Sequence, residues 1–192
     1  PLPAIAIGYR MPDPVAELSG YLGYAVLAAV LTEGDASRLQ QRMVHTEALV
    51  TDISARAGLM GAPLDSRDPD TFNLTAIHAP AVDADKLLAV LDAEFDRLAT
   101  DGPTADELAM VSARYRAELH TEHDRLMSRT LVYGATELLH GRAELVAELP
   151  ELIAAVDAEQ IRAAAAALAP HTRAVLTVTP SGTAADEEGQ HA

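Results

Sequence analysis

One short stretch of the sequence has residue types that could bind a metal ion. His120, Glu122 and His123 lie within four consecutive positions, and two histidines three residues apart can share one face of a helix. Imidazole and carboxylate groups are ligands that zinc accepts, with Glu122 or His140 completing the set. The same polar residues are also typical of a solvated junction between two helices, which is the interpretation that we favour. We therefore assign no catalytic residue and no metal ligand.

Other residues that could do chemistry have simpler structural interpretations. The sequence contains no G-x-S-x-G elbow, no G-x-x-x-x-G-K-[ST] loop and no G-x-G-x-x-G turn. His78 alternates onto the apolar face of a predicted strand, which is typical of a core or edge histidine, and His45 is predicted on the exposed side of its helix. Gly20 and Gly23 fall inside an apolar helix, where close packing against another element explains a missing side chain.

Composition excludes several classes of function. The 192 residues carry a net charge of -15, so no basic stripe is available for nucleic acid or an anionic membrane. The chain has no cysteine, which excludes a disulfide framework, a thiolate zinc site and a cysteine nucleophile. With 49% apolar residues it can bury a full core. Its longest apolar run, residues 21–31, is too short to cross a bilayer.

The first half of the chain is predicted to contain both strands and helices. Hydrophobic periodicity predicts strands and helices over these ranges: a strand over 4–10, a helix over 15–32, a short helix over 37–47, and strands over 49–59 and 71–79. In the second of these strands, Thr51, Ile53 and Ala55 are predicted to share one face. The last two strands follow each other through a loop rich in Gly, Pro and Asp, so we expect them to be antiparallel neighbours.

The second half is predicted to be mainly helical. Asp83 is a good N-cap for a helix that ends at Gly102, and Thr104 with Glu107 forms the pattern of a capping box for the next helix. Further helices are predicted over 124–139 and 158–168, followed by a strand over 173–179.

These elements predict an α+β fold, in which helices pack on one face of a largely antiparallel sheet. We expect one domain over residues 1–180. Residues 181–192 have no apolar periodicity and are predicted to be a disordered tail.

Several short segments, taken in order, resemble the second, non-catalytic half of the pitrilysin/insulinase family of zinc metallopeptidases. These segments are Gly8-Tyr9-Arg10-Met11-Pro12, the apolar helix over 21–31, Gly34, Ser37-Arg38-Leu39, and the strand that runs from Leu49 to Ala55. The resemblance extends to about Pro180, and it includes bacterial relatives of mitochondrial processing peptidase. It implies the same α+β domain that the periodicity predicts.

The resemblance also implies where the zinc of such a peptidase is bound. The family binds zinc through H-x-x-E-H on a helix of its earlier domain, and neither this motif nor H-E-x-x-H occurs in the chain. We therefore expect no cofactor in this chain and expect zinc in a catalytic N-terminal domain outside it. The isolated chain is expected to be inactive.

In the family, the later domain supplies an arginine and a tyrosine that contact the substrate. The resemblance puts the arginine position at Val44 and the tyrosine position at Thr51, so neither side chain is present. Arg38 and Arg42 lie nearby but off the helix face of Val44, and we do not transfer the role to them. The chain could therefore belong to the zinc-bearing partner of a two-chain peptidase or to a degenerate member.

Three functions remain open. The chain could form the wall of the substrate chamber and the dimer contact of a zinc-dependent peptidase, it could be an inactive scaffold or regulatory subunit of the same fold, or it could be an unrelated α+β interaction module. For the first, the expected partners are the N-terminal domain of the same protein, a second copy or a paired family subunit, and a peptide substrate. We expect neither nucleic acid nor a membrane as partner, and a cytoplasmic location.

Overall fold

The computed structural model describes residues 2–59 and 63–180, and the side chains of His120, Glu122 and His123 are outside that description. The predicted disordered tail, residues 181–192, lies outside the described residues. The strands are β1 (Ala4–Arg10), β2 (Val50–Ala57), β3 (Thr71–His78) and β4 (Arg173–Val178). The helices are α1 (Leu18–Thr32), η1 (Gln40–Thr46), α2 (Ala84–Asp101), α3 (Ala105–His123), α4 (Leu126–His140), α5 (Leu145–Ala154), α6 (Ala158–Ala167) and η2 (Pro170–Thr172).

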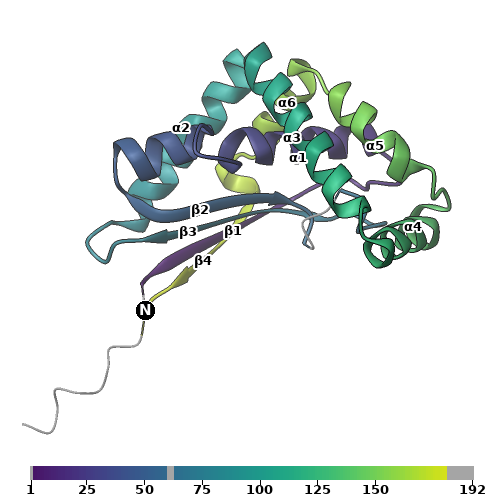
Figure 1. Ribbon diagram of the computed structural model, residues 1–192. Coiled ribbons are helices and arrows are strands. Elements are labelled where there is room, and N and C mark those ends of the chain that lie inside the picture. Colours follow the sequence, from purple (N-terminus) through teal and green to yellow (C-terminus); the bar gives the residue numbers. More distant parts are fainter. Residues whose placement is uncertain (1, 60–62, 181–192) are drawn as a thin grey trace, which may run out of the picture.

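The described strands form one antiparallel sheet in the order β2-β3-β1-β4, and the helices cover one of its faces (Figure 1). This arrangement confirms the predicted α+β class and the antiparallel pairing of β2 with β3. The apolar rows of the sheet, such as Ile7 with Leu74 and Ala55, are buried against the helices. The opposite face, which we call the open face, has no helix over it in Figure 1.

Caps set the helix boundaries where the sequence predicts them. The Asp83 side chain accepts a hydrogen bond from the backbone N–H of Asp85 at the start of α2. At the start of α3, the backbone N–H of Thr104 donates to Glu107 Oε2 and the N–H of Glu107 donates to Thr104 Oγ1, which completes the capping box. Gly102 ends α2 with φ of 75°, a conformation that glycine adopts without strain.

One helix was missed and another has an unexpected form. Helix α5 lies between two predicted helices and contains Pro150, which hid its periodicity, although Leu149 and Ile153 are buried. The predicted helix over 37–47 exists, but residues 40–46 form a π-helix, in which the N–H of Glu47 donates to the carbonyl oxygen of Arg42. Periodicity does not distinguish this wider helix from an α-helix over so few residues.

The predicted face of β2 is wrong at one residue. Ile53 and Ala55 are buried, but Thr51 is exposed because the pairing with β3 shifts between Val50 and Asp52. Such a bulge adds one residue to the strand and puts the residues before it out of phase. A sequence pattern with a period of two cannot reveal it.

The two apolar-helix glycines have different surroundings. A Cβ on Gly23 would lie 3.3 Å from the backbone oxygen of Gln160 in α6, which confirms close helix packing there. The three atoms nearest to a Cβ on Gly20 all belong to the side chain of Glu17, in the turn before the same helix. Packing against another element therefore explains Gly23 and does not explain Gly20.

We expect Ala48→Gly to stabilise the domain. Ala48 is exposed and has φ of 48°, the left-handed region in which a Cβ costs about 1–2 kcal/mol. Glycine removes that cost but loses about 0.4–1 kcal/mol through the greater freedom of the unfolded chain. A net gain of about 0.5 kcal/mol should appear as a higher urea midpoint. Ala36→Gly, at an exposed position without positive φ, should lower the midpoint instead.

Candidate functional site

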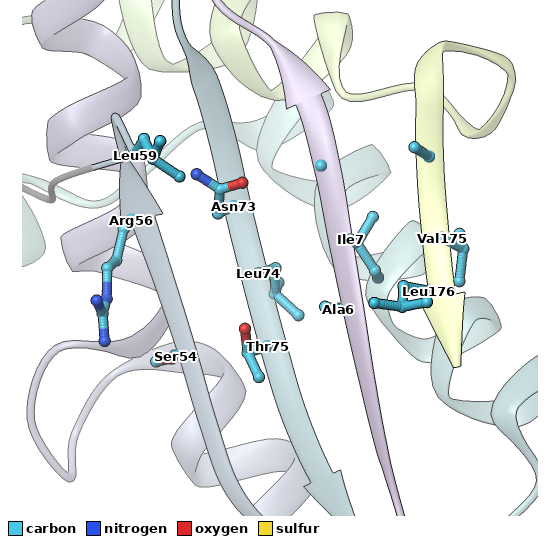
Figure 2. A pocket seen from close by; sticks show the side chains of 12 residues that line it. Ala6, Ile7, Ser54, Arg56, Leu59, Asn73, Leu74, Thr75, Val175 and Leu176 are labelled. Carbon is cyan, nitrogen blue, oxygen red and sulfur yellow. The ribbon is translucent and has the colours of Figure 1, made fainter. Parts of the chain in front are cut away.

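The open face of the sheet is hollowed across all of its strands. The hollow has a volume of about 450 Å³. Its floor is low because Ala6 and Gly8 of β1 have almost no side chain, whereas Leu59 beyond β2 and Leu176 of β4 rise at its two sides (Figure 2). Strand register places Gly8 between Asn73 and Ala174, so the low part of the floor continues from Gly8 to Ala174. This shape suits an extended chain lying on the sheet.

Polar groups line one side of the hollow. Ser54 of β2 and Asn73 and Thr75 of β3 line it, and the Arg56 side chain borders it along the side of β2 that faces away from β3 (Figure 2). The amide nitrogen of Asn73 donates to the backbone oxygen and the hydroxyl of Thr71, which leaves its carbonyl oxygen available. Within the described part of the chain, the Arg56 guanidinium forms no ion pair. The site therefore offers hydrogen-bond donors and acceptors and one positive charge.

Sequence reasoning did not single out this site. The alternation of polar residues in β3 and the small residues of β1 were visible in the sequence, but both patterns also fit an ordinary solvated face. Strand order, which brings Arg56, Asn73 and Gly8 into one row, was needed to show that they line one hollow.

The histidines do not converge on a metal site among the residues described. His120 and His123 lie in the last turn of α3, and their side chains and that of Glu122 lie outside the described residues. His140 Nε2 lies 3.0 Å from the backbone oxygen of Leu64, so this candidate ligand is engaged with the chain. No group of three or more His, Cys, Asp or Glu side chains that could hold a metal ion occurs in the described part.

His78 and His45 lie where the periodicity predicts them. His78 is buried at the end of β3, with Nδ1 3.0 Å from the backbone oxygen of Ala79. His45 is exposed on η1. Neither position indicates chemistry.

The positions that the resemblance assigns to substrate contact carry no group for that task. Val44 is half-buried in η1 and packs against the core. Thr51 is exposed, and its hydroxyl donates to the backbone oxygen of Ile77 at 3.3 Å. Neither residue lines the hollow on the open face.

Comparison with known protein families shows to which family the chain belongs. The profile of the peptidase M16 inactive domain matches residues 1–115, which is more than half of the chain. The chain belongs to the M16 peptidase family. A search of curated proteins found no match.

Solved structures show the same M16 fold. A protease from Helicobacter pylori superposes with a TM-score of 0.79 at 17% identity, over 93% of this chain and 41% of that one. The inactive peptidase domain of a candidate zinc protease from Bordetella parapertussis gives 0.77 at 18% identity, over 94% and 91% of the two chains. The ferredoxin protease FusC, in complex with Arabidopsis ferredoxin, gives 0.63 at 14% identity, over 94% and 19%. This M16 domain thus spans well under half the length of the Helicobacter protease.

Two arginines next to the positions that the resemblance assigns to substrate contact belong to an ion-pair cluster around the buried Glu94. The Arg38 guanidinium donates to both carboxylate oxygens of Glu107 at 2.7 and 2.9 Å, and it lies 3.3 Å from Glu94, whose side chain is only 2% exposed. Arg42 and Arg97 face the same Glu94 carboxylate at 3.5 and 3.4 Å. Arg38, which precedes η1, and Arg42 within η1 therefore tie this segment to α2 and α3.

The ion-pair cluster of Arg38, Glu94 and Glu107 predicts how the stability of the domain depends on pH. The hydrogen bond from Arg38 holds the pKa of Glu107 below its ordinary value. A carboxylate with a lowered pKa stabilises the folded state above its unfolded pKa of about 4.3, and this stabilisation is lost as pH falls through the folded pKa. We expect the urea midpoint of the native domain to fall more steeply below about pH 4 than that of Glu107→Gln.

Glu33 is a control whose pKa is shifted in the opposite direction. Partial burial raises the pKa of Glu33, whose side chain stays 44% exposed, so the folded state favours its neutral form. The stabilisation that Glu33 contributes to the folded state is present at low pH and is lost as pH rises through the folded pKa. Glu33→Gln should therefore gain stability relative to the native domain at neutral pH. Parallel pH profiles for both variants and the native domain would contradict the assignment.

Proposed function

We propose that this chain is the non-catalytic C-terminal domain of a zinc-dependent peptidase. In this proposal the open face of the sheet forms part of the wall of the substrate chamber, and the domain takes part in a dimer contact. The observation that carries the proposal is the hollow on the open face, with polar groups at one side and no helix over it. Membership of the family of inactive M16 domains supports the same assignment.

The hollow fits a polypeptide better than a compact small molecule. It is wide and shallow, and the small side chains of Ala6 and Gly8 let an extended chain approach the sheet. Asn73, Thr75 and Ser54 can exchange hydrogen bonds with peptide groups irrespective of the substrate sequence. The Helicobacter protease and FusC, by their descriptions, act on polypeptides, which supports the same substrate class here.

In this proposal zinc is bound by an N-terminal domain outside the 192 residues. Zinc would activate a water molecule for attack on the peptide bond. This chain would hold the polypeptide and restrict its exit.

Cross-linking in the full-length protein that contains this chain, which we call the parent, tests whether the open face forms a wall of the substrate chamber. A photoreactive amino acid at Ser54, on the open face, should cross-link to a bound peptide substrate. The same group at Lys86, which is exposed on α2 in the helix layer, should not. Equal cross-linking at both positions, or none at Ser54 in a parent that binds peptide, would reject a chamber wall on this face.

Zinc content and activity separate the peptidase from an inactive scaffold. Close to one zinc per parent chain, with peptide hydrolysis lost on chelation, is the expected result for a peptidase. A parent that holds no zinc and cleaves nothing would identify the scaffold instead. The isolated chain should not hydrolyse a mixed peptide library, and hydrolysis by it that a chelator stops would overturn the assignment as non-catalytic.

A further inference from the structure

Two arginines on the open face of the sheet have no acidic partner. Arg10 is the last residue of β1, Arg56 lies near the end of β2, and both are exposed. Neither forms an ion pair or a side-chain hydrogen bond within residues 2–59 and 63–180. Most of the other arginines pair with carboxylates. Because the sequence has 29 acidic and 14 basic side chains, a shortage of carboxylates does not explain an unpaired arginine.

Both arginines lie at the same end of the open face. Alternate residues of β1 and β2 are buried against the helices, which puts Arg10 and Arg56 on the other side of the sheet. Arg10 stands opposite Thr71 of β3, and Arg56 stands opposite Asn73 of the same strand. A strand spacing of about 4.8 Å and a rise of about 3.4 Å per residue put the two Cα atoms roughly 12 Å apart. Exposed side chains change rotamer rapidly, so both guanidinium groups can turn toward a chain that lies in the hollow.

The carboxylates of Asp70 and Asp52 leave these arginines unpaired. Asp70 precedes β3 beside Arg10, and its Oδ1 accepts hydrogen bonds from the backbone N–H groups of Leu59 and Thr71. Asp52 shares the open face of β2 with Arg56, but it stands opposite Ile77, beyond the other end of the hollow. The open face therefore has a positive end and a negative end.

We propose that the open face binds polypeptide segments that carry acidic side chains, and that these side chains lie at the Arg10–Arg56 end. The inference rests on the proposed function and deepens it, because it names the class of polypeptide that the chamber wall receives. A guanidinium can bind a carboxylate through two parallel hydrogen bonds, which suits arginine to the recognition of Asp and Glu. Ser54, Asn73 and Thr75 then contact the uncharged part of the same segment.

The net charge of the chain, -15, would by itself produce the opposite preference. Through long-range electrostatics, an acidic domain attracts basic peptides and repels acidic ones. At an ionic strength of about 0.15 M, charges more than about 8 Å apart are largely screened. A preference for acidic peptides under these conditions therefore has to come from cations that contact the peptide. Among the strand residues of the open face, these cations are Arg10 and Arg56.

Peptide cross-linking in the parent tests the proposal. The probe is a short biotinylated peptide of Gly, Ser, Thr and Val with a pair of Glu residues near one end. Both termini are blocked and uncharged, and a partner peptide has Gln in place of Glu. With the photoreactive amino acid at Ser54, the cross-linking yield against peptide concentration gives an apparent Kd for each peptide. At physiological ionic strength the Glu peptide should bind about fivefold more tightly than the Gln peptide.

Neutral variants assign the preference to the two arginines. Arg10→Gln and Arg56→Gln should each reduce it to about twofold, and the double variant should remove it. Both side chains are exposed, so the variants should fold as the native protein does. Lys86→Gln is the matched control, because Lys86 is exposed on α2 in the helix layer and the variant loses the same charge. Its preference for the Glu peptide should equal that of the native protein.

Charge reversal separates recognition from a loss of structure. In the double variant Arg10→Glu with Arg56→Glu, a peptide with Lys in place of Glu should bind more tightly than the Glu peptide. A damaged fold cannot invert the order of the peptides. Lys86→Glu with Arg129→Glu changes the net charge equally at exposed positions of the helix layer, and should keep the native order. An order that the reversal of Arg10 and Arg56 leaves unchanged would overturn the proposal.

A further peptide distinguishes the source of the negative charge. It has the sequence of the Gln peptide but a free C-terminal carboxylate. We expect it to bind like the blocked Gln peptide, because the site selects acidic side chains. If the free C-terminus strengthens binding and Glu does not, the arginines receive a chain end, and the proposal is overturned.

Failure of this inference is distinguishable from failure of the proposed function. Equal binding of the Glu and Gln peptides, with both cross-linked at Ser54, would reject the acidic preference and leave the chamber wall intact. Absence of cross-linking at Ser54, in a parent that binds these peptides, would reject the chamber wall and the acidic preference together.

Discussion

Arg38→Ala is expected to destabilise the domain by about 3 kcal/mol. The substitution removes two hydrogen bonds to Glu107, one to the backbone oxygen of Gly102 and an ion pair to Glu94. Because the Glu94 side chain is only 2% exposed, water cannot replace the lost guanidinium. Breaking a buried pair costs about 3–5 kcal/mol, and we expect the low end because Arg42 and Arg97 still face Glu94.

Urea unfolding measures this cost, and Arg114→Ala is the matched control. Arg114 pairs with Glu33 and Glu118 on the surface, where these side chains are 44% exposed or more, so its loss should cost less than about 1 kcal/mol. Arg38→Lys keeps the charge but loses the bidentate contact with Glu107. Its loss of stability should therefore lie between those of Arg38→Ala and Arg114→Ala. Equal midpoints for Arg38→Ala and Arg114→Ala would show that the buried cluster contributes no more than a surface pair.

Tyr9→Ala should cost about 4 kcal/mol and is the largest effect that we expect. Tyr9 is 2% exposed, and its ring packs edge-on against Phe72 at 6.4 Å and Phe95 at 6.0 Å between ring centres. It therefore joins β1 to β3 and to α2. Truncation leaves a cavity that the rings of Phe72 on β3 and Phe95 on α2 cannot fill by collapsing.

Tyr9→Phe separates the ring from its hydroxyl. The Arg173 guanidinium donates to the Tyr9 hydroxyl at 3.4 Å and also pairs with Asp92. The phenylalanine variant keeps the ring contacts and Arg173 keeps Asp92, so we expect a loss of only about 1 kcal/mol in urea unfolding. A loss in Tyr9→Phe as large as in Tyr9→Ala would show that the hydroxyl, and not the ring, stabilises the core.

Much of the fold could be predicted because its signals are local. The bounds of β1 matched the prediction at both ends, and Asp83, Gly102, Thr104 and Glu107 set the ends of α2 and the start of α3. A cap depends on a side chain and the backbone within three or four residues of it, so the sequence contains all of its parts. The bulge at Thr51 and the π-helix depend instead on pairing and packing with distant segments, and they were not predicted.

The strand β4 shows the same limit of prediction from local sequence. Its alternation was visible, but Val175, Leu176 and Val178 are all between 43% and 63% exposed, because the strand lies at the edge of the sheet and the helix layer covers little of it. Alternation shows which residues share a face. It does not show whether anything covers that face.

None of the helices in the described residues combines the length and the apolarity that a membrane span needs.

The sequence by itself determined the class of fold, the family resemblance, the absence of H-x-x-E-H from the chain, and that Val44 and Thr51 stand where the resemblance puts the arginine and the tyrosine. These depend on residue identity and on spacing along the chain. Tertiary structure alone decided which face of the sheet is open, that Gly8 and Arg56 line one hollow, that Arg38 pairs with a buried glutamate, and that large apolar side chains of α4 are exposed. The reason is physical: exposure, charge pairing and cavity shape depend on residues from distant segments, and only the packed chain brings these together.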